Sequence, residues 1–167
     1  HSGFSGVYGH FPFNDEEIIC RCGNRGCLET VASGSALYRM FLEKLEAGSV
    51  SVLSDKFKSN GKITMEDILS AIESEDVLAI EILETVGHNL GKAIAGLINM
   101  FNPEVIVIGG TLSVAKEYLM LPVRNAINKY SLMLVNKDTQ IRLSTLGERA
   151  GVMGACILAR SKSLGLF

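Results

Sequence analysis

The chain has 167 residues, of which 47% are hydrophobic, and its formal charge is −2 at pH 7. This is enough apolar sequence for one domain with its own core, and the lack of a run of Lys and Arg argues against a DNA-binding surface. The longest strongly apolar region, residues 93–100, is too short to span a bilayer, and residues 1–15 contain no apolar segment typical of a secretion signal. We therefore expect no membrane contact. The four cysteines do not form the disulfide framework of a small secreted domain, so we expect a reducing, cytoplasmic compartment.

The first 13 residues are rich in Gly, Ser and aromatic side chains, which predicts an extended strand or hairpin with tight turns. The sequence starts at His1 without an initiator Met and without a preceding helix or strand, which is typical of the middle of a domain. We therefore expect that an N-terminal part of the full protein is absent from this sequence.

Three of the four cysteines fall within eight residues, in a polar loop over residues 14–27 that also contains two glycines. Nine residues separate His10 from the first of them. Three thiolates and one imidazole complete a tetrahedral zinc site, and a filled fourth position leaves no water to activate. The pattern therefore predicts a structural zinc ion held by His10, Cys20, Cys22 and Cys27.

Two other interpretations of these thiols stay open. They are incidental, or Cys20 and Cys22 form a redox pair, although a Cys-x-Cys pair is geometrically awkward as a disulfide. The isolated Cys156 lies in an apolar stretch near the end of the chain, where we expect it to be a small buried residue.

A first helix is predicted over residues 35–47, with Ser35 as its N-cap and Gly48 as its stop. Its apolar face lies in the core or at an interface between subunits, and consists of Leu37, Phe41 and Leu45. The polar residues 48–62 predict a loop or a short turn.

A second helix is predicted to open at Thr64 and to run to Ile72, because Thr64 and Asp67 have the spacing of a capping box. The longest helix is predicted over residues 75–101, where apolar residues recur every three or four positions. Three glycines inside it suggest close packing against another backbone, because each costs about 1 kcal/mol relative to Ala in a helix interior. Asn102-Pro103 ends this helix.

The remaining sequence alternates strands with helices. Residues 104–108 predict a short buried parallel strand that ends in Gly109-Gly110, and residues 113–130 predict a helix with Pro122 inside it. A second strand is predicted over residues 140–146 and a closing helix over residues 147–163. This order predicts an α/β fold in a single domain spanning residues 1–167.

The run Gly9-His10 followed by Cys20-x-Cys22-Gly23-x-x-Gly26-Cys27-Leu28-Glu29 resembles the signature of the ROK family of bacterial sugar kinases and sugar-responsive repressors. Residues 101–110, and Leu146-Gly147 with residues 151–155, resemble later parts of the same family. The resemblance implies one lobe, the C-terminal half, of a fold similar to actin and hexokinase (ribonuclease H-like). A zinc loop at residues 10–29 would lie beside a sugar cleft.

The resemblance also implies roles for single residues. His10, Cys20, Cys22 and Cys27 match the zinc ligands, and the free ring nitrogen of His10 can face the sugar. Glu29 matches a carboxylate that accepts hydrogen bonds from sugar hydroxyls, with a solvated surface residue as the alternative. Gly109 and Gly110 match a turn beside the nucleotide in the kinases, with a tight strand exit as the alternative.

The stretch Gly6-Val7-Tyr8-Gly9-His10 departs from the family pattern, which usually has Glu three residues before the histidine. Val7 cannot accept a sugar hydroxyl, and losing one charged hydrogen bond costs roughly 1.5–3 kcal/mol. Tyr8 is a poor substitute, because in an extended segment it points to the opposite face from Val7.

Two functional hypotheses follow from the resemblance. The first is the sugar-sensing part of a transcriptional regulator that binds a sugar or sugar phosphate, forms a homo-oligomer and contacts DNA only through an absent N-terminal domain. The second is the C-terminal half of an ATP-dependent sugar kinase of the glucokinase or fructokinase type, and only this one needs ATP. The change at Val7 favours the regulator, because catalysis needs a precisely placed substrate hydroxyl.

Overall fold

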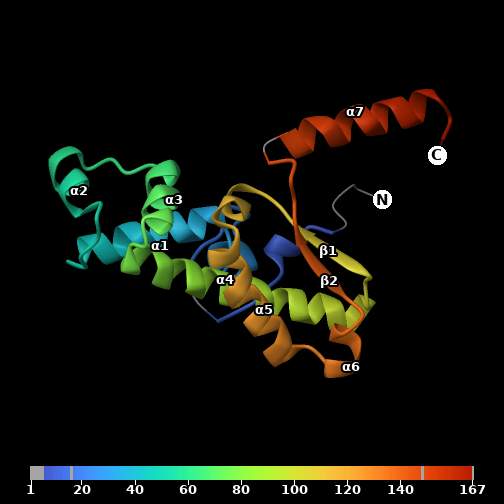
Figure 1. Ribbon diagram of the computed structural model, residues 1–167, viewed down its shortest axis with the longest axis horizontal. Helices are drawn as coiled ribbons and strands as arrows, with labels where there is room; N and C mark the ends of the chain where they lie inside the picture. The colour runs from blue at the N-terminus through green and yellow to red at the C-terminus, as the bar shows by residue number, and fades with distance from the viewer. Residues whose placement is uncertain (1–5, 16, 148, 167) are drawn as a thin grey trace.

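The computed structural model describes residues 6–15, 17–147 and 149–166 (Figure 1). The elements are short 3-10 helices (η), α-helices and two strands. In chain order they are η1 (Tyr8–His10), η2 (Leu28–Thr30), α1 (Gly34–Glu46), α2 (Ser54–Asn60), α3 (Met65–Glu73), α4 (Val77–Phe101), β1 (Val105–Ile108), η3 (Thr111–Ala115), α5 (Glu117–Tyr130), α6 (Met133–Asn136), β2 (Gln140–Leu143) and α7 (Arg149–Ser163). No helix in these ranges is both long and apolar enough to cross a membrane.

The described strands form a two-stranded parallel sheet, which confirms the mixed α/β class. Val105 pairs with Gln140 and Ile108 pairs with Leu143. The prediction that the first strand is buried is wrong for most of it: Ile108 is 8% exposed, but Val107 is 61% exposed. Ile106 and Ile108 pack against the core, whereas the alternate side chains point to the face that no described element covers.

Helix α4 is the centre of the core. It packs against α1, α3 and α5, and two of its fully buried residues, Val86 and Ile98, lie about three turns apart. The predicted apolar face of α1 is buried in the same cluster, since Leu37 and Phe41 are 0% exposed and Leu45 is 7% exposed. That face therefore belongs to the core rather than to a subunit interface.

Two of the three glycines inside α4 allow α5 to approach closely, as predicted, whereas a Cβ atom on the third, Gly96, would make only an ordinary contact of 3.5 Å with the Tyr8 hydroxyl. A Cβ atom on Gly87 would lie 2.7 Å from Cγ of Pro122, and one on Gly91 would collide with the carbonyl oxygen of Val123. Pro122 is inside α5, in its second turn, and its buried ring packs against the space that Gly87 leaves open. Because glycine has no side chain, the backbones of α4 and α5 can lie close together at these two positions.

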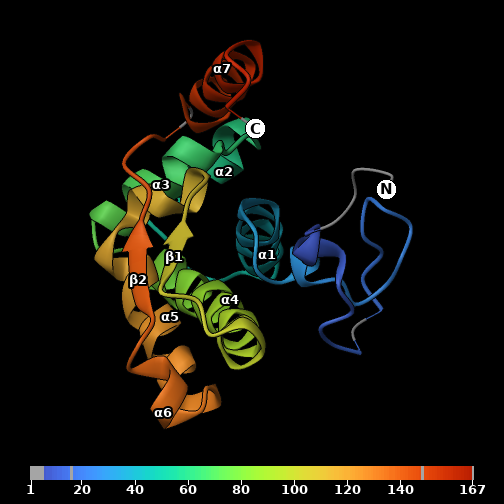
Figure 2. The same cartoon turned by 90° about the vertical axis from the view of Figure 1, so that its right-hand side faces the viewer.

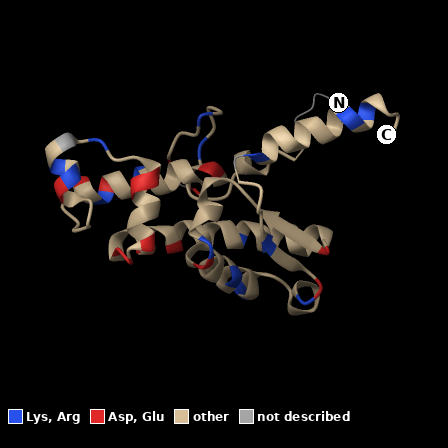
Figure 3. Cartoon of the chain, turned by 45° about the horizontal axis from the view of Figure 1, so that its top comes forward, with Lys and Arg blue, Asp and Glu red and all other residues tan. Residues whose placement is uncertain are grey.

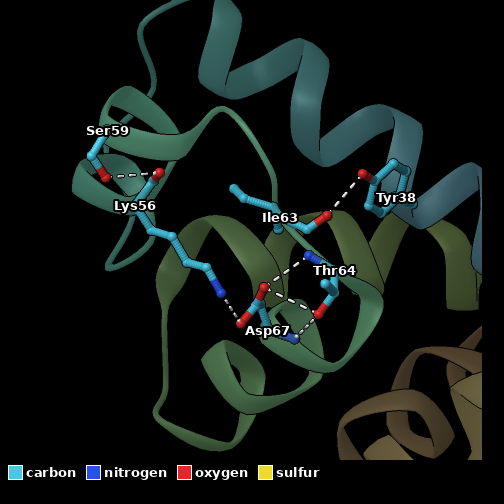
Figure 4. A network of polar contacts seen from close by, with 6 residues as sticks. All are labelled: Tyr38, Lys56, Ser59, Ile63, Thr64 and Asp67. Carbon is cyan, nitrogen blue, oxygen red and sulfur yellow. Dashed lines mark hydrogen bonds and ion pairs between the residues drawn. The ribbon is translucent and has the colours of Figure 1, made fainter.

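The polar contacts at helix starts confirm one predicted cap and correct another. The capping box at Thr64 is present: its hydroxyl accepts from the Asp67 amide, and the Asp67 carboxylate accepts from the Thr64 amide (Figure 4). Asp67 also pairs with Lys56 at 2.6 Å. The N-cap of α1 is Ser33 rather than Ser35, because the Ser33 hydroxyl accepts from the Ala36 amide at 3.1 Å.

Three further predictions are wrong. Residues 48–62 contain α2, whose polar composition hid a helix that ends at Gly61 with φ +62°. Within the predicted N-terminal strand or hairpin, residues 1–5 lie outside the described residues, residues 8–10 form η1, and only Pro12 makes a strand-like bridge, to Cys27. Cys156 is exposed, because α7 extends beyond the end of the sheet (Figures 1 and 2) and lies clear of the other helices in Figure 1.

The close approach of α4 and α5 predicts a large effect of one methyl group. Gly91→Ala should lower the free energy of unfolding by about 1–3 kcal/mol, because the added Cβ overlaps the α5 backbone. Gly151→Ala in α7, where a Cβ would have no neighbour within 4 Å, is the control and should leave stability unchanged or raise it by up to about 1 kcal/mol. Urea unfolding measures both, and equal stability of Gly91→Ala and wild type would contradict the packing.

The ion pair of Asp67 predicts a pH dependence. The hydrogen bond from Lys56, followed by that from the Thr64 amide, holds the pKa of the Asp67 carboxyl below its usual value. Its stabilising effect is therefore complete above the ordinary Asp pKa of about 3.9 and is lost as pH falls through the lowered value. In urea titrations from pH 7 to pH 3, Asp67→Asn should lose less stability than wild type, while the neighbouring exposed Glu66→Gln should follow wild type. Parallel curves for Asp67→Asn and wild type would rule out the effect.

Candidate metal centre

The predicted metal loop is closed at its base by antiparallel backbone contacts. The amide of Phe13 donates to the carbonyl of Gly26 at 2.7 Å, and the amide of Leu28 donates to Phe11 at 3.0 Å. These bonds place the segment that follows His10 beside the segment that carries Cys27. Residues seventeen positions apart therefore meet at one point.

A tight turn presents the other two thiols. The amide of Gly23 donates to the carbonyl of Cys20 at 2.9 Å, and the amide of Cys20 donates to Asn24 at 2.8 Å. Gly26 has φ +67°, and a Cβ at this position would collide with the carbonyl oxygen of Asn14, so the turn needs glycine there. Outside the turn, Arg25 forms an ion pair with Glu17.

The structure brings all four predicted ligands together. One ligand atom from each of them lies within 4.8 Å of the other three. Nδ1 of His10 is 3.5 Å from Sγ of Cys20, and Sγ of Cys22 is 3.6 Å from Sγ of Cys27. With Zn–S bonds of about 2.3 Å and Zn–N bonds of about 2.0 Å, the ligand atoms of a tetrahedral site are about 3.5–3.8 Å apart. The cluster therefore could hold a metal ion of this kind.

The ligands differ in environment. Cys20 and Cys27 are 4% and 1% exposed, whereas His10 and Cys22 are exposed. Burial, and then the neighbouring thiols, raises the pKa of the Cys27 thiol to about 12, while a backbone hydrogen bond at Asn24 lowers the pKa of Cys22. Three thiolates repel one another in so small a volume, and a divalent ion bound there would supply the positive charge that keeps them deprotonated.

Contacts with α4 fix the loop on the core, and these were not identified from the sequence. The hydroxyl of Tyr8 donates to the carbonyl of Ala93 at 3.2 Å, and burial raises the pKa of Tyr8. Nζ of Lys92 lies 5.1 Å from the ring centroid of Phe13. The aromatic residues on both sides of His10 were the available signal, but only the structure shows that their partner is α4.

Glu29 lies in η2, close to the histidine ligand. A Cβ atom on Gly9 would be 3.3 Å from Oε2 of Glu29, so the carboxylate lies against the backbone that precedes His10. The same side chain lines an open cavity of about 180 Å³ with Arg21 and Arg39. The structure therefore brings the two predicted sugar-binding residues, His10 and Glu29, to one place.

The predicted nucleotide turn lies elsewhere. Gly109 and Gly110 line a separate, mostly apolar cavity of about 410 Å³ between β1 and α4, together with Tyr8 and Ser33. Gly110 has φ +89°, which makes glycine necessary at the strand exit. A tight strand exit is thus present whether or not a nucleotide binds.

Val7 immediately precedes η1 and is 49% exposed. Its apolar side chain stands two residues before Gly9, and the Glu29 carboxylate lies against the backbone of Gly9. The hydroxyl of the next residue, Tyr8, donates to the carbonyl of Ala93. Residues 6–9 therefore contain no side-chain carboxylate, and their one side-chain hydroxyl is already bonded to α4.

Known proteins are similar in sequence to this chain over nearly its whole length. The family model for the ROK family matches residues 1–162. The chain is 36% identical to a glucokinase of Halalkalibacterium halodurans, over 96% of this chain and 49% of that protein. It is 34% identical to a xylose repressor of Caldicellulosiruptor bescii, over 98% of this chain and 41% of that protein.

A solved structure shares the fold. The crystal structure of a ROK family glucokinase from Streptomyces griseus, in complex with glucose and AMPPNP, superposes with a TM-score of 0.82 at 27% identity. The match covers 92% of this chain and 51% of that one. The chain thus spans about half, or less, of the length of these relatives.

The ligand geometry predicts that the purified protein contains about one metal ion per chain, which we expect to be zinc. Cys22→Ser should reduce the metal content measured by elemental analysis and lower the melting temperature by at least about 5 °C, because the loop loses its cross-link. Cys156→Ser, at an exposed thiol outside the cluster, is the control. Full stability of Cys22→Ser after metal loss would contradict a structural role.

Proposed function

The chain belongs to the ROK family, and we propose that it forms the sugar-responsive part of a transcriptional regulator whose metal loop holds a structural zinc ion. DNA contact would come from a part of the protein outside this sequence. The zinc ion, when bound, cross-links the loop and carries no open position for chemistry. The function of the loop is then to hold two side chains in a defined place.

The sugar site in this proposal consists of His10 and Glu29. Metal binding through Nδ1 would leave Nε2 of His10 free to donate to a hydroxyl, with its tautomer fixed. The Glu29 carboxylate, against the backbone of Gly9, would accept from a hydroxyl on the same sugar. The hydroxyl of Ser33 donates to the carbonyl of Glu29 at 2.6 Å, which ties the backbone of this residue to the start of α1.

The observation that carries the choice of regulator is the environment of Val7. A kinase must place one hydroxyl precisely for phosphoryl transfer, and a misplacement of about 1 Å can cost about 100-fold in rate. A sensor needs only a difference in affinity between two states. An apolar, half-exposed residue where a sugar-binding carboxylate is expected is therefore tolerable in a sensor and damaging in a kinase.

A sugar kinase remains the second candidate, and a specific observation favours it. Gly109 and Gly110 line a cavity large enough for part of a nucleotide, and glucokinases are among the relatives. The two candidates differ in turnover: the full-length protein should release no ADP when mixed with ATP and glucose or xylose if it is a regulator. Steady ADP release that depends on sugar would favour the kinase.

The proposed sugar site predicts the effect of one substitution. In calorimetric titrations of the full-length protein with xylose, glucose and N-acetylglucosamine, Glu29→Ala should weaken binding of the preferred sugar at least about tenfold, because a charged acceptor is lost. Glu46→Ala, at an exposed carboxylate at the end of α1, is the matched control and should bind as wild type does. Unchanged affinity of Glu29→Ala would exclude the role assigned to this residue.

A further inference from the structure

Lys92 of α4 lies over two aromatic rings that come from distant parts of the chain. Its Nζ is 5.1 Å from the ring centroid of Phe13, at the base of the metal loop, and 5.8 Å from that of Tyr130, the last residue of α5. An ammonium group within about 6 Å of a ring centroid is attracted to the face of the ring. Figure 3 marks the lysine and arginine segments of the fold in blue. One cation thus connects α4 with both the metal loop and α5.

The charge of Lys92 is not neutralised by a carboxylate. Among the described residues, Lys92 takes part in no salt bridge. None of the residues three or four positions before or after it in α4 is acidic, so the helix itself offers no ion-pair partner. The interactions of this ammonium group are therefore those with the Phe13 and Tyr130 rings.

Tyr130 is itself held in place by two other residues of α4. Its carbonyl accepts a hydrogen bond from Nδ2 of Asn99 at 3.3 Å. Its ring meets that of His88 edge-on, with centroids 5.6 Å apart. Because Tyr130 is fixed at both its backbone and its ring, it gives the Lys92 ammonium group a defined position on the core.

The two contacts between α4 and the metal loop lie on opposite sides of the ligand histidine. Tyr8 precedes His10 by two residues and donates to the carbonyl of Ala93, whereas Phe13 follows His10 by three residues and meets Lys92. Lys92 and Ala93 are neighbours, so one turn of α4 holds the chain both before and after His10. His10 is exposed, and its position therefore depends on these attachments rather than on packing in the core.

We propose that Lys92 is a positioning residue of the metal centre, whose charge acts through Phe13 to keep Nδ1 of His10 where it and the three thiols can share one ion. Removal of this charge weakens the attachment of the chain after His10 to α4, so the ligand set is less well preorganised and binds metal less tightly. This inference rests on the metal loop of the proposed function. It gives a residue outside the ligand set a part in retaining the ion.

Lys129 provides a matched comparison for Lys92. Its Nζ lies 5.3 Å from the centroid of the same Tyr130 ring, and it too takes part in no salt bridge among the described residues. Of the two lysines, Lys92 is the one for which the structure also shows a contact with Phe13. Loss of charge at Lys129 therefore removes a cation from the Tyr130 ring and leaves the contact between Lys92 and the loop in place.

Metal binding by the full-length protein tests the proposal. In titrations with Co²⁺, followed by the visible absorption of the tetrahedral thiolate complex, Lys92→Met should bind at least about threefold more weakly than wild type. It should also release zinc to a chelator at least about threefold faster. Lys92→Arg should behave as wild type does, because a guanidinium group also binds the face of a ring. Lys129→Met is the control and should keep wild-type affinity.

Phe13→Leu tests the same contact from the side of the loop. It removes the ring but keeps an apolar side chain, and it should weaken Co²⁺ binding about as much as Lys92→Met does. The double variant Lys92→Met/Phe13→Leu should bind no more weakly than either single variant, because both substitutions remove one interaction. Losses that add up in the double variant would mean that the two residues act independently, and would overturn the proposal.

The remaining outcomes are equally decisive for Lys92. Wild-type affinity of Lys92→Met, an equal loss in Lys129→Met, or no recovery in Lys92→Arg would each overturn its role as a positioning residue. If wild type binds neither cobalt nor zinc, the metal site of the proposed function fails and this inference fails with it. If wild type binds metal and one of the other results is found, only the role of Lys92 fails.

Discussion

The packing of α4 against its neighbours is the constraint on which the described structure depends. Gly87 and Gly91 bring α5 onto one side of it, Ala93 accepts the Tyr8 hydroxyl on another, and Ile94 faces the cavity beside β1. A helix that meets three different elements has little freedom to shift, because interiors are close-packed and respond to the addition of a single methyl group. The position of the metal loop is thus set by the same helix that sets the core.

The metal loop has almost no core of its own. Backbone hydrogen bonds close its base and its inner turn, and its buried side chains include two of the thiols that would bind the metal. Chain segments of this length cannot bury enough apolar surface to offset their loss of conformational entropy. The contacts of Tyr8 and Phe13 with α4, and the metal ion that the His–Cys cluster could hold, would hold this loop in place instead. The contacts that keep the metal loop ordered therefore also determine the position of Glu29.

The sequence predicted best where a feature is local. Ligand type and spacing identified the four residues that the structure brings together, and the Thr64–Asp67 spacing identified a real capping box. The sequence predicted poorly where burial or helix formation depends on contacts with distant segments. Cys156 looked like a core residue because its neighbours are apolar, but no described element covers α7. In α2, Ser, Lys and Asn dominate, and only Phe57 packs against the core, so periodicity gave no helical signal.

The position of Tyr8 explains why its hydroxyl cannot replace the carboxylate that the family pattern has at position 7. A kinase ancestor or relative that lost this acceptor could recover it from a neighbouring hydroxyl, and Tyr8 is the nearest one in sequence. Its hydroxyl, however, donates to Ala93 and holds η1 on α4, so turning it toward a ligand would release the segment that carries His10. Rescue of catalysis would thus loosen the metal site. The proposed sensor would avoid this conflict, because in that proposal His10 and Glu29 need only remain where the loop holds them.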